Sequence, residues 1–179
     1  RICKNKIHAS YIKMCKSDRF DKFGLKIKAP DFKGSYVLVC PSSDSINNYL
    51  DRPNWTEETV AQIKRYTDRP IKIRHKPRGN GTSGPSEAKV PLSEDLKDAW
   101  VCVTSCSIVA VEAQCMGIPV VCDEKSFAKE VGGQELADIE NPFFVGCEDW
   151  LYSLAYQQFT PEEISNGKAV EILMDKGIL

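Results

Sequence analysis

Four short apolar runs, rich in β-branched residues, recur along the chain and predict strands. They cover residues 36–40, 71–74, 100–103 and 119–122. The apolar positions within them are nearly continuous and do not alternate with polar ones, which is typical of strands buried on both faces of a parallel sheet. The stretches between the runs are long enough for the helical crossovers that parallel strands need.

Helical patterns separate and follow these runs, at residues 55–66, 107–116, 126–131, 149–158 and 161–174. We expect Thr56 to cap the first of these helices. Gly117 stands where the second should end on a left-handed glycine, and Gly132 closes the third. Thr160 followed by Pro161 marks the start of the last helix, because proline favours the first helical position.

The order β-α-β-(loop, short helix)-β-α-β-α-α-α predicts an α/β fold. We expect an open, mainly parallel, doubly wound (Rossmann-like) sheet with helices on both faces and a C-terminal helical segment. Residues 1–35 are expected to form a basic N-terminal segment, and residues 36–179 a Rossmann-like domain with C-terminal helices at 149–174. Ligands of such sheets bind at the carboxyl ends of the strands. A Gly/Ser-rich stretch at 78–86 is expected to be an active-site flap.

Charge is unevenly distributed, although the formal net charge is only −1. Residues 1–33 carry ten basic and three acidic side chains, whereas residues 94–179 carry five and sixteen. Such a split indicates either a basic cleft that faces an anion or two solvated surfaces. No apolar run reaches the ~20 residues of a membrane span, and the first residues lack a signal-peptide stretch. A soluble, cytoplasmic protein is therefore expected, and the absence of an initial Met suggests a fragment of a longer chain.

Eight cysteines and two histidines show no zinc-type spacing, since no CxxC pair occurs. Cys40, Cys102 and Cys122 end apolar runs, where cysteine behaves as a small buried hydrophobe. Catalytic cysteine chemistry is the alternative. The dinucleotide and Walker A fingerprints are also absent, so we expect no metal and no cofactor.

The densest candidate site lies where the third strand meets a helix. Thr104, Ser105 and Ser107 stand at this junction, where unpaired helix amides favour a phosphate group. Glu112, five residues beyond Ser107, either faces solvent or holds the hydroxyl pair of a ribose. The plainer interpretation of the whole segment is a helix cap followed by an exposed glutamate.

Two further candidate sites follow the second and first strands. Arg74, His75 and Lys76 combine a guanidinium fork, a titratable ring and a point charge, a set suited to an anion. A solvated basic loop is the alternative. Ser42 and Ser43 form either an anion-binding nest or an ordinary turn.

Together these segments resemble the C-terminal, nucleotide-donor-binding half of GT-B glycosyltransferases, nearest to capsule-type Kdo transferases and teichoic-acid CDP-glycerol glycerophosphotransferases. The resemblance covers residues 36–133 and rests on IRHKP at 73–77, DAWVCVTSCS at 98–107 and VEAQCMGIPV at 111–120. The chain departs from the family pattern where Lys76 separates His75 from a proline and where Cys106 interrupts the serine pair. Residues 55–71 also resemble small phage-encoded proteins.

The resemblance implies a glycosyltransferase-like protein that transfers a sugar or polyol phosphate from a nucleotide-activated donor. The acceptor, a glycan or a nucleic acid, stays unassigned. His75 would be catalytic, and the donor would bind to Ser42, Ser43, Arg74, Lys76, Thr104, Ser105, Ser107 and Glu112.

A complete GT-B enzyme also needs an acceptor domain, of which residues 1–35 would be only a remnant or a part. Two other hypotheses therefore stand beside the enzyme. One is a non-catalytic binding or interaction module derived from the GT-B fold. The other is a nucleic-acid glycosyltransferase that holds its acceptor with the basic N-terminal segment. Because the acceptor domain is incomplete, a homo-oligomer in which a second copy completes the cleft is a further expectation.

Overall fold

The computed structural model describes residues 11–76 and 90–179. The flap expected at 78–86 lies outside the described residues. The chain divides into two compact units. We call Ile27–Val145 the sheet unit, and we call Gly146–Leu179 with the described part of Arg1–Lys26 the helical unit.

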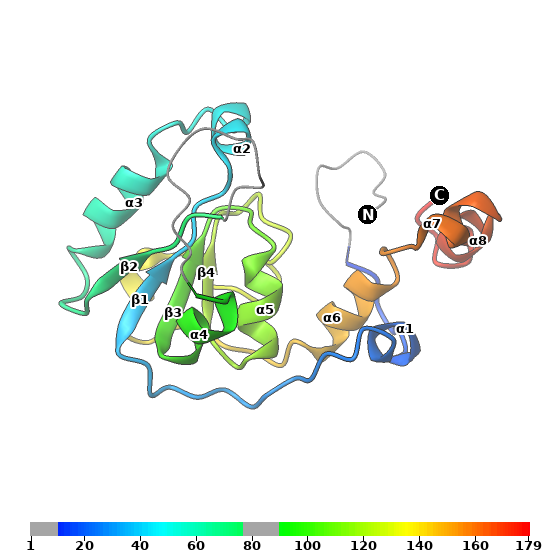
Figure 1. Ribbon diagram of the computed structural model, residues 1–179, viewed down its shortest axis with the longest axis horizontal. Helices are drawn as coiled ribbons and strands as arrows, with labels where there is room; N and C mark the ends of the chain where they lie inside the picture. The colour runs from blue at the N-terminus through cyan, green and yellow to red at the C-terminus, as the bar shows by residue number, and fades with distance from the viewer. Residues whose placement is uncertain (1–10, 77–89) are drawn as a thin grey trace. The chain divides into compact units, whose positions relative to one another are not determined.

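The sheet unit is built on four parallel strands in the spatial order β2-β1-β3-β4 (Figure 1). The strands are β1 (Tyr36–Val39), β2 (Ile71–Ile73), β3 (Ala99–Thr104) and β4 (Val120–Cys122). All four predicted strands are therefore present to within about one residue at each end, and the open α/β fold is confirmed. The pairing places Leu38 of β1 opposite Cys102 of β3 and Val39 opposite Val103.

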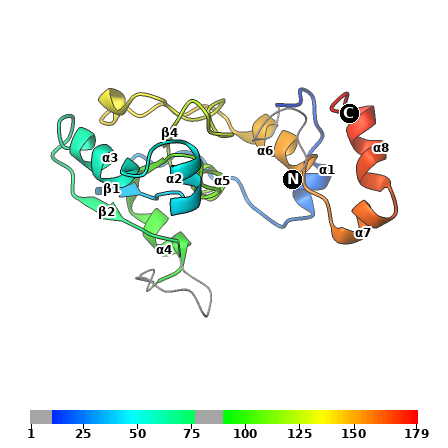
Figure 2. The ribbon, with the colours of Figure 1, turned by 90° about the horizontal axis from the view of Figure 1, so that it is seen from above.

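Helices flank this sheet, and the described part of the helical unit contains four short helices (Figures 1 and 2). The sheet unit contains α2 (Asp44–Tyr49), α3 (Trp55–Ile63), α4 (Leu92–Lys97), α5 (Val109–Cys115) and the 3-10 helix η1 (Leu136–Asp138). The helical unit contains α1 (Asp18–Asp21), α6 (Glu148–Ala155), α7 (Pro161–Ser165) and α8 (Lys168–Asp175). None of the helices in the described part of the chain is both long and apolar enough to cross a membrane.

Three helix predictions are corrected by the structure. Asn54, not Thr56, precedes α3, because a turn bond from the amide of Trp55 to Arg52 O starts the helix earlier. Residues 126–131 form successive turns and no helix, since the Ser126 hydroxyl accepts the amide of Ala128. The helix expected at 161–174 is split by Gly167, whose φ of +81° cannot continue a right-handed helix.

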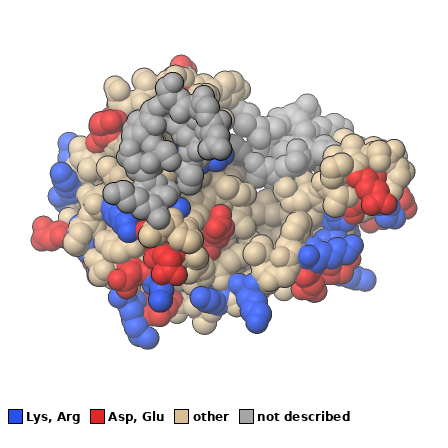
Figure 3. Space-filling model, viewed as in Figure 1, with Lys and Arg blue, Asp and Glu red and all other residues tan. Residues whose placement is uncertain are grey.

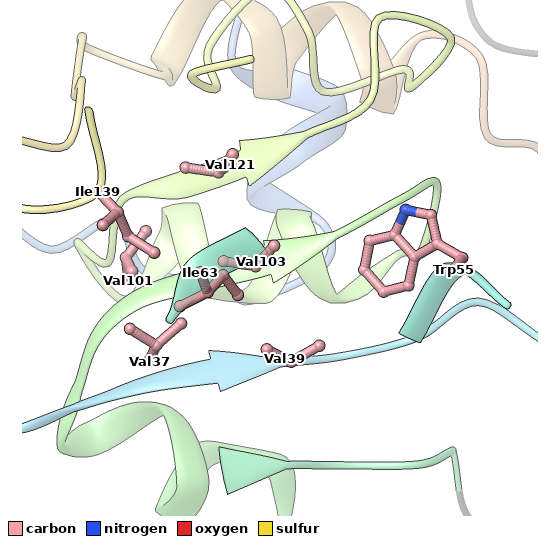
Figure 4. Packing of buried hydrophobic residues seen from close by; sticks show 8 residues of the cluster. All are labelled: Val37, Val39, Trp55, Ile63, Val101, Val103, Val121 and Ile139. Atoms are coloured by element: carbon pink, nitrogen blue, oxygen red, sulfur yellow. The ribbon is translucent and has the colours of Figure 1, made fainter. Parts of the chain in front are cut away.

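Both faces of the sheet are buried along β1, β3 and β4, as continuous apolar strands predict, whereas the edge strand β2 is half-buried or exposed. On one face the apolar side chains of β1, β3 and β4 pack against α3 and the segment after η1 (Figure 4). This cluster consists of Val37, Val39, Trp55, Ile63, Val101, Val103, Val121 and Ile139. Residues that alternate with them, such as Leu38 and Cys102, are fully buried as well. Period-2 alternation puts these on the opposite face of the sheet.

The helical unit holds a buried arginine that joins three of its segments. Arg19 donates Nε–H to Ala155 O (3.2 Å) and Nη2–H to Gln158 O (2.5 Å), and its Nη1 pairs with Glu163 Oε1 at 2.7 Å. Glu163 also completes a capping box with Thr160, which confirms Thr160 as the N-cap of α7. Hydrogen bonds from Arg19 and from the Thr160 amide lower the pKa of Glu163 to about 2.

We expect Glu163→Gln to destabilise the helical unit by about 2 kcal/mol at pH 7, because it removes a charge-assisted pair from Arg19. A carboxyl whose pKa is lowered by folding stabilises the fold above its unfolded pKa of about 4.3 and loses that effect as pH falls. The deficit of the variant should therefore vanish between about pH 4.3 and pH 2. Native-state hydrogen exchange of α6 to α8, compared between the parent chain and Glu163→Gln as a function of pH, measures this loss of stability. Glu162→Gln, at the exposed neighbouring position, should show no such loss.

Candidate functional site

The strand order creates a switch point between β1 and β3. From β1 the chain crosses to β2 on one side, and later returns to β3 on the other side of β1. The carboxyl ends of β1 and β3 are therefore adjacent, and the connections that leave them diverge. In open α/β sheets this is the place where ligands bind.

A pocket of about 410 Å³ opens at this point, and we call it the switch-point pocket. Segments from the ends of three strands line it, with contributions from α2, α4 and α5. Seven of the nine predicted site residues are in its wall: Ser42, Ser43, Arg74, His75, Lys76, Ser107 and Glu112. The remaining wall consists of Cys40, Pro41, Ile46, Leu92, Cys106, Ile108 and Val109. Three segments far apart in sequence thus meet around one space.

The two other predicted residues, Thr104 and Ser105, lie behind the lining and are almost completely buried. Thr104 donates its hydroxyl to Cys40 O at 2.7 Å. The hydroxyls of Ser105 and Ser42 are 2.6 Å apart, and the Cys106 amide donates to Ser42 Oγ at 3.2 Å. These bonds tie the end of β3 to the end of β1, so the structure gives Thr104 and Ser105 a positioning role in the wall.

The helix that follows β3 starts two residues later than expected. α5 begins at Val109, and the Ser107 hydroxyl accepts the Val109 amide at 3.4 Å. Ser107 is thus in the turn before the helix, and its hydroxyl is already hydrogen-bonded to the Val109 amide. Glu112 lies in the first turn of α5 and is exposed. At the other end, Gly117 has a φ of +76°, which confirms it as the left-handed residue that terminates α5.

The basic side of the pocket is partly neutralised by a residue that the sequence did not reveal. Asp95 of α4 has a side chain only 5% exposed and pairs with Arg74 Nη1 and with Lys72 Nζ (2.5 Å). Burial alone would raise the pKa of Asp95, but the hydrogen bonds from Lys72 and Arg74 outweigh it and lower the pKa. Asp95 lies beside Glu94 in a short helix of mixed polar and apolar residues, so its sequence position gave no sign of this pairing.

His75 and Lys76 are exposed at the pocket. Among the described residues, no carboxylate lies within ion-pair distance of Lys76. Because the Arg74 charge is engaged by Asp95, Lys76 is the cation of this wall best able to meet an anionic ligand. On the face drawn in Figure 3, basic and acidic side chains are interspersed, with no continuous basic surface among the visible residues.

Cys106 lines the pocket and is half-buried. Burial raises the pKa of its thiol to about 11, so the thiol is protonated at neutral pH. The thiolate is the nucleophilic form of cysteine, so this environment does not favour catalytic cysteine chemistry. Cys40, Cys102 and Cys122 are buried, as expected for cysteines that end apolar strands. Within the described ranges, no group of three His, Cys, Asp or Glu side chains could hold a metal ion.

Comparisons with known proteins assign no family or function to the chain. No family model matches the chain, and neither a curated protein nor a solved structure does.

Proposed function

We propose that the switch-point pocket binds a nucleotide-activated donor, and that the chain is a glycosyltransferase-like protein that transfers a sugar or polyol phosphate. The observation that carries this proposal is the convergence of three separate sequence segments on one pocket at the topological switch point. These are the segments that resemble the donor-binding half of GT-B glycosyltransferases. A pocket of about 410 Å³ is within the ~300–1,000 Å³ range of small-molecule sites.

Five polar residues of the wall contact the ligand in this proposal. Lys76 and His75 meet the phosphate groups, and His75 donates to the leaving phosphate or acts as an acid or base. Hydroxyls of Ser43 and Ser107 add neutral contacts. Glu112 accepts hydrogen bonds from a ribose or sugar diol. Catalysis is then electrostatic, because fixed donors stabilise the charge that develops on the departing phosphate.

A second candidate, a binding module without turnover, is favoured by the Arg74–Asp95 pair. This pair removes much of one positive charge from the wall, which reduces the stabilisation available for the additional negative charge that develops on a departing phosphate. The two candidates share the ligand and differ only in turnover. Release of nucleotide from a labelled donor, with water or an added glycan as acceptor, distinguishes them.

We expect Lys76→Glu to weaken binding of a nucleoside diphosphate by about 1–2 kcal/mol, or about five- to thirtyfold, because it reverses the charge opposite the phosphates. The matching nucleoside, which lacks phosphate, should lose much less. Isothermal titration calorimetry with both ligands measures the difference. Lys97→Glu, an equal charge change at an exposed site outside the pocket wall, is the control. Equal losses for both ligands would show that Lys76 does not contact phosphate.

Glu112→Gln should give the opposite pattern. It replaces one of the two acceptor oxygens of the carboxylate by an amide donor and removes the negative charge, so we expect nucleoside affinity to fall by about 1 kcal/mol while binding of inorganic pyrophosphate holds or improves. Glu130→Gln, another exposed glutamate that does not line the pocket, provides the comparison. Unchanged nucleoside affinity would reduce Glu112 to a surface residue.

A further inference from the structure

A second cleft, of about 200 Å³, lies at the carboxyl ends of β3 and β4, and we call it the β4 cleft. It shares no lining residue with the switch-point pocket. Its wall consists of Arg52, Trp55, Thr59, Gln62, Val103, Thr104, Val121, Cys122, Asp123, Gln134, Glu135 and Leu136. Trp55, Val103 and Val121 belong to the apolar cluster drawn in Figure 4, so the cleft has an apolar floor beneath polar walls.

An ion pair in the wall of this cleft joins the turn before α3 to the residue after β4. Arg52 Nη1 is 2.6 Å from Asp123 Oδ1, and the two side chains are 40% and 24% exposed. A guanidinium has five N–H donors and a carboxylate about four acceptor positions, so this one contact leaves donors and acceptors for a ligand. The pair also fixes both groups in place, which reduces the entropy lost on binding.

Thr59 supplies the second observation. It is only 4% exposed, on the face of α3 that lines the cleft. No hydrogen bond joins its hydroxyl to another described residue, and this hydroxyl is not one of the buried polar atoms that lack a partner, so it is accessible from the cleft. A threonine hydroxyl can both donate and accept, so a ligand hydroxyl or carbonyl group in the cleft can bond to it.

The chemistry of the wall selects the class of ligand. The charged side chains are one cation, Arg52, and two carboxylates, Asp123 and Glu135, so a phosphate group is disfavoured here. Thr59 and the two glutamines, Gln62 and Gln134, can each donate and accept. Hydroxyl groups can also do both. The volume is below the ~300–1,000 Å³ of typical small-molecule sites, which leaves room for about one ring and not for a nucleotide.

We propose that the β4 cleft binds a neutral polyhydroxylated ligand, a single sugar ring or a short polyol. Asp123 and Glu135 accept from its hydroxyls, Arg52 donates to them, and Thr59 bonds to the group that lies deepest. This site is separate from the donor pocket and does not depend on the function proposed for that pocket.

Tryptophan fluorescence of the full chain tests the proposal, because Trp55 lines the cleft while Trp100 and Trp150 do not. The chain is titrated with D-glucose, D-galactose, ribitol and glycerol, and with inorganic phosphate. We expect a saturable change with at least one of the four polyols and none with phosphate. Thr59→Val should weaken that binding about five- to tenfold, the range for one lost hydrogen bond. Thr56→Val, the same substitution at a position of α3 outside the cleft, should leave it unchanged.

Loss of binding in Thr59→Val is informative because the variant should fold. Removing an unpartnered hydroxyl and keeping the side-chain shape is expected to leave stability unchanged or raised. Gln134→Ala, at an exposed position of the wall, is a second variant that should weaken binding. The proposal is overturned if no polyol gives a saturable change, if phosphate binds in preference, or if both variants bind as tightly as the parent chain.

Discussion

Gly117→Ala is expected to destabilise the sheet unit by about 2–5 kcal/mol. Gly117 has a φ of +76°, a region that costs other residues about 1–2 kcal/mol. It also ends α5 in a Schellman motif, in which Ile118 N–H donates to Ala113 O and Gly117 N–H to Gln114 O.

The chain around Lys28 passes directly over this turn. Lys28 N–H donates to Cys115 O at 2.8 Å, and a Cβ on Gly117 would clash with the carbonyl oxygen of Ala29. Overpacking of this kind adds about 1–3 kcal/mol to the conformational cost. Urea unfolding measures the effect in a Trp150→Phe background, where Trp55 and Trp100 both report on the sheet unit.

Gly133→Ala is the matched control for Gly117→Ala. Gly133 also lies in the sheet unit, but it does not have a left-handed backbone conformation, and a Cβ there would meet Val121 at an ordinary 3.7 Å. We expect a change within about 1 kcal/mol at this position. Similar losses in the two variants would show that segment 28–31 does not pack on the end of α5 as described.

Asp95→Asn is the second change with a large expected effect. It leaves Arg74, whose side chain is only 9% exposed, without its charge partner. Breaking a buried pair in this way costs about 3–5 kcal/mol. Because the second partner, Lys72, is 48% exposed and stays solvated, we expect the lower end, about 3 kcal/mol at pH 7. The same urea assay measures it.

The dependence on pH identifies the cause. The pKa of Asp95 is lowered in the folded chain, so its stabilising effect is complete above the unfolded value of about 3.9 and is lost as pH falls below that value. The gap between the parent chain and Asp95→Asn should therefore close in acid. Asp31→Asn removes a partner from an exposed pair with Lys33 and should cost almost nothing. A gap that persists unchanged below the folded pKa of Asp95 would point to altered packing and not to charge.

The sheet could be predicted from sequence because its signal is local. In β1, β3 and β4 burial on both faces makes the apolar run continuous, whereas the edge strand β2 has a lysine at its centre and is half-buried or exposed. The short helices could not be predicted in the same way. α2 depends on the Ser43 hydroxyl accepting the Ile46 amide, a bond that a serine-rich turn offers as readily as a helix. The break at Gly167 depends on one backbone angle, since the residues on either side continue a helical pattern.

The site was predictable in part for a topological reason. Parallel strands bring their carboxyl ends to one edge, so segments after β1, β2 and β3 were expected to meet, and the residues predicted after each strand do line one pocket. Asp95 and Thr59 were missed, because their importance comes from what packs around them. Neither belongs to a motif, and each is buried within an ordinary helix.

The measurement that most directly tests the donor pocket is a thermal-shift screen of the chain against UDP, CMP, CDP, GDP and ADP and their common sugar conjugates. A ligand at a hundred times its Kd stabilises the fold by about 2.7 kcal/mol, which is several degrees for a domain of this size. We expect a shift with one base, reduced in Glu112→Gln and in Lys76→Glu. No shift with any nucleotide, or a shift that both variants keep in full, would contradict a nucleotide site at the switch point.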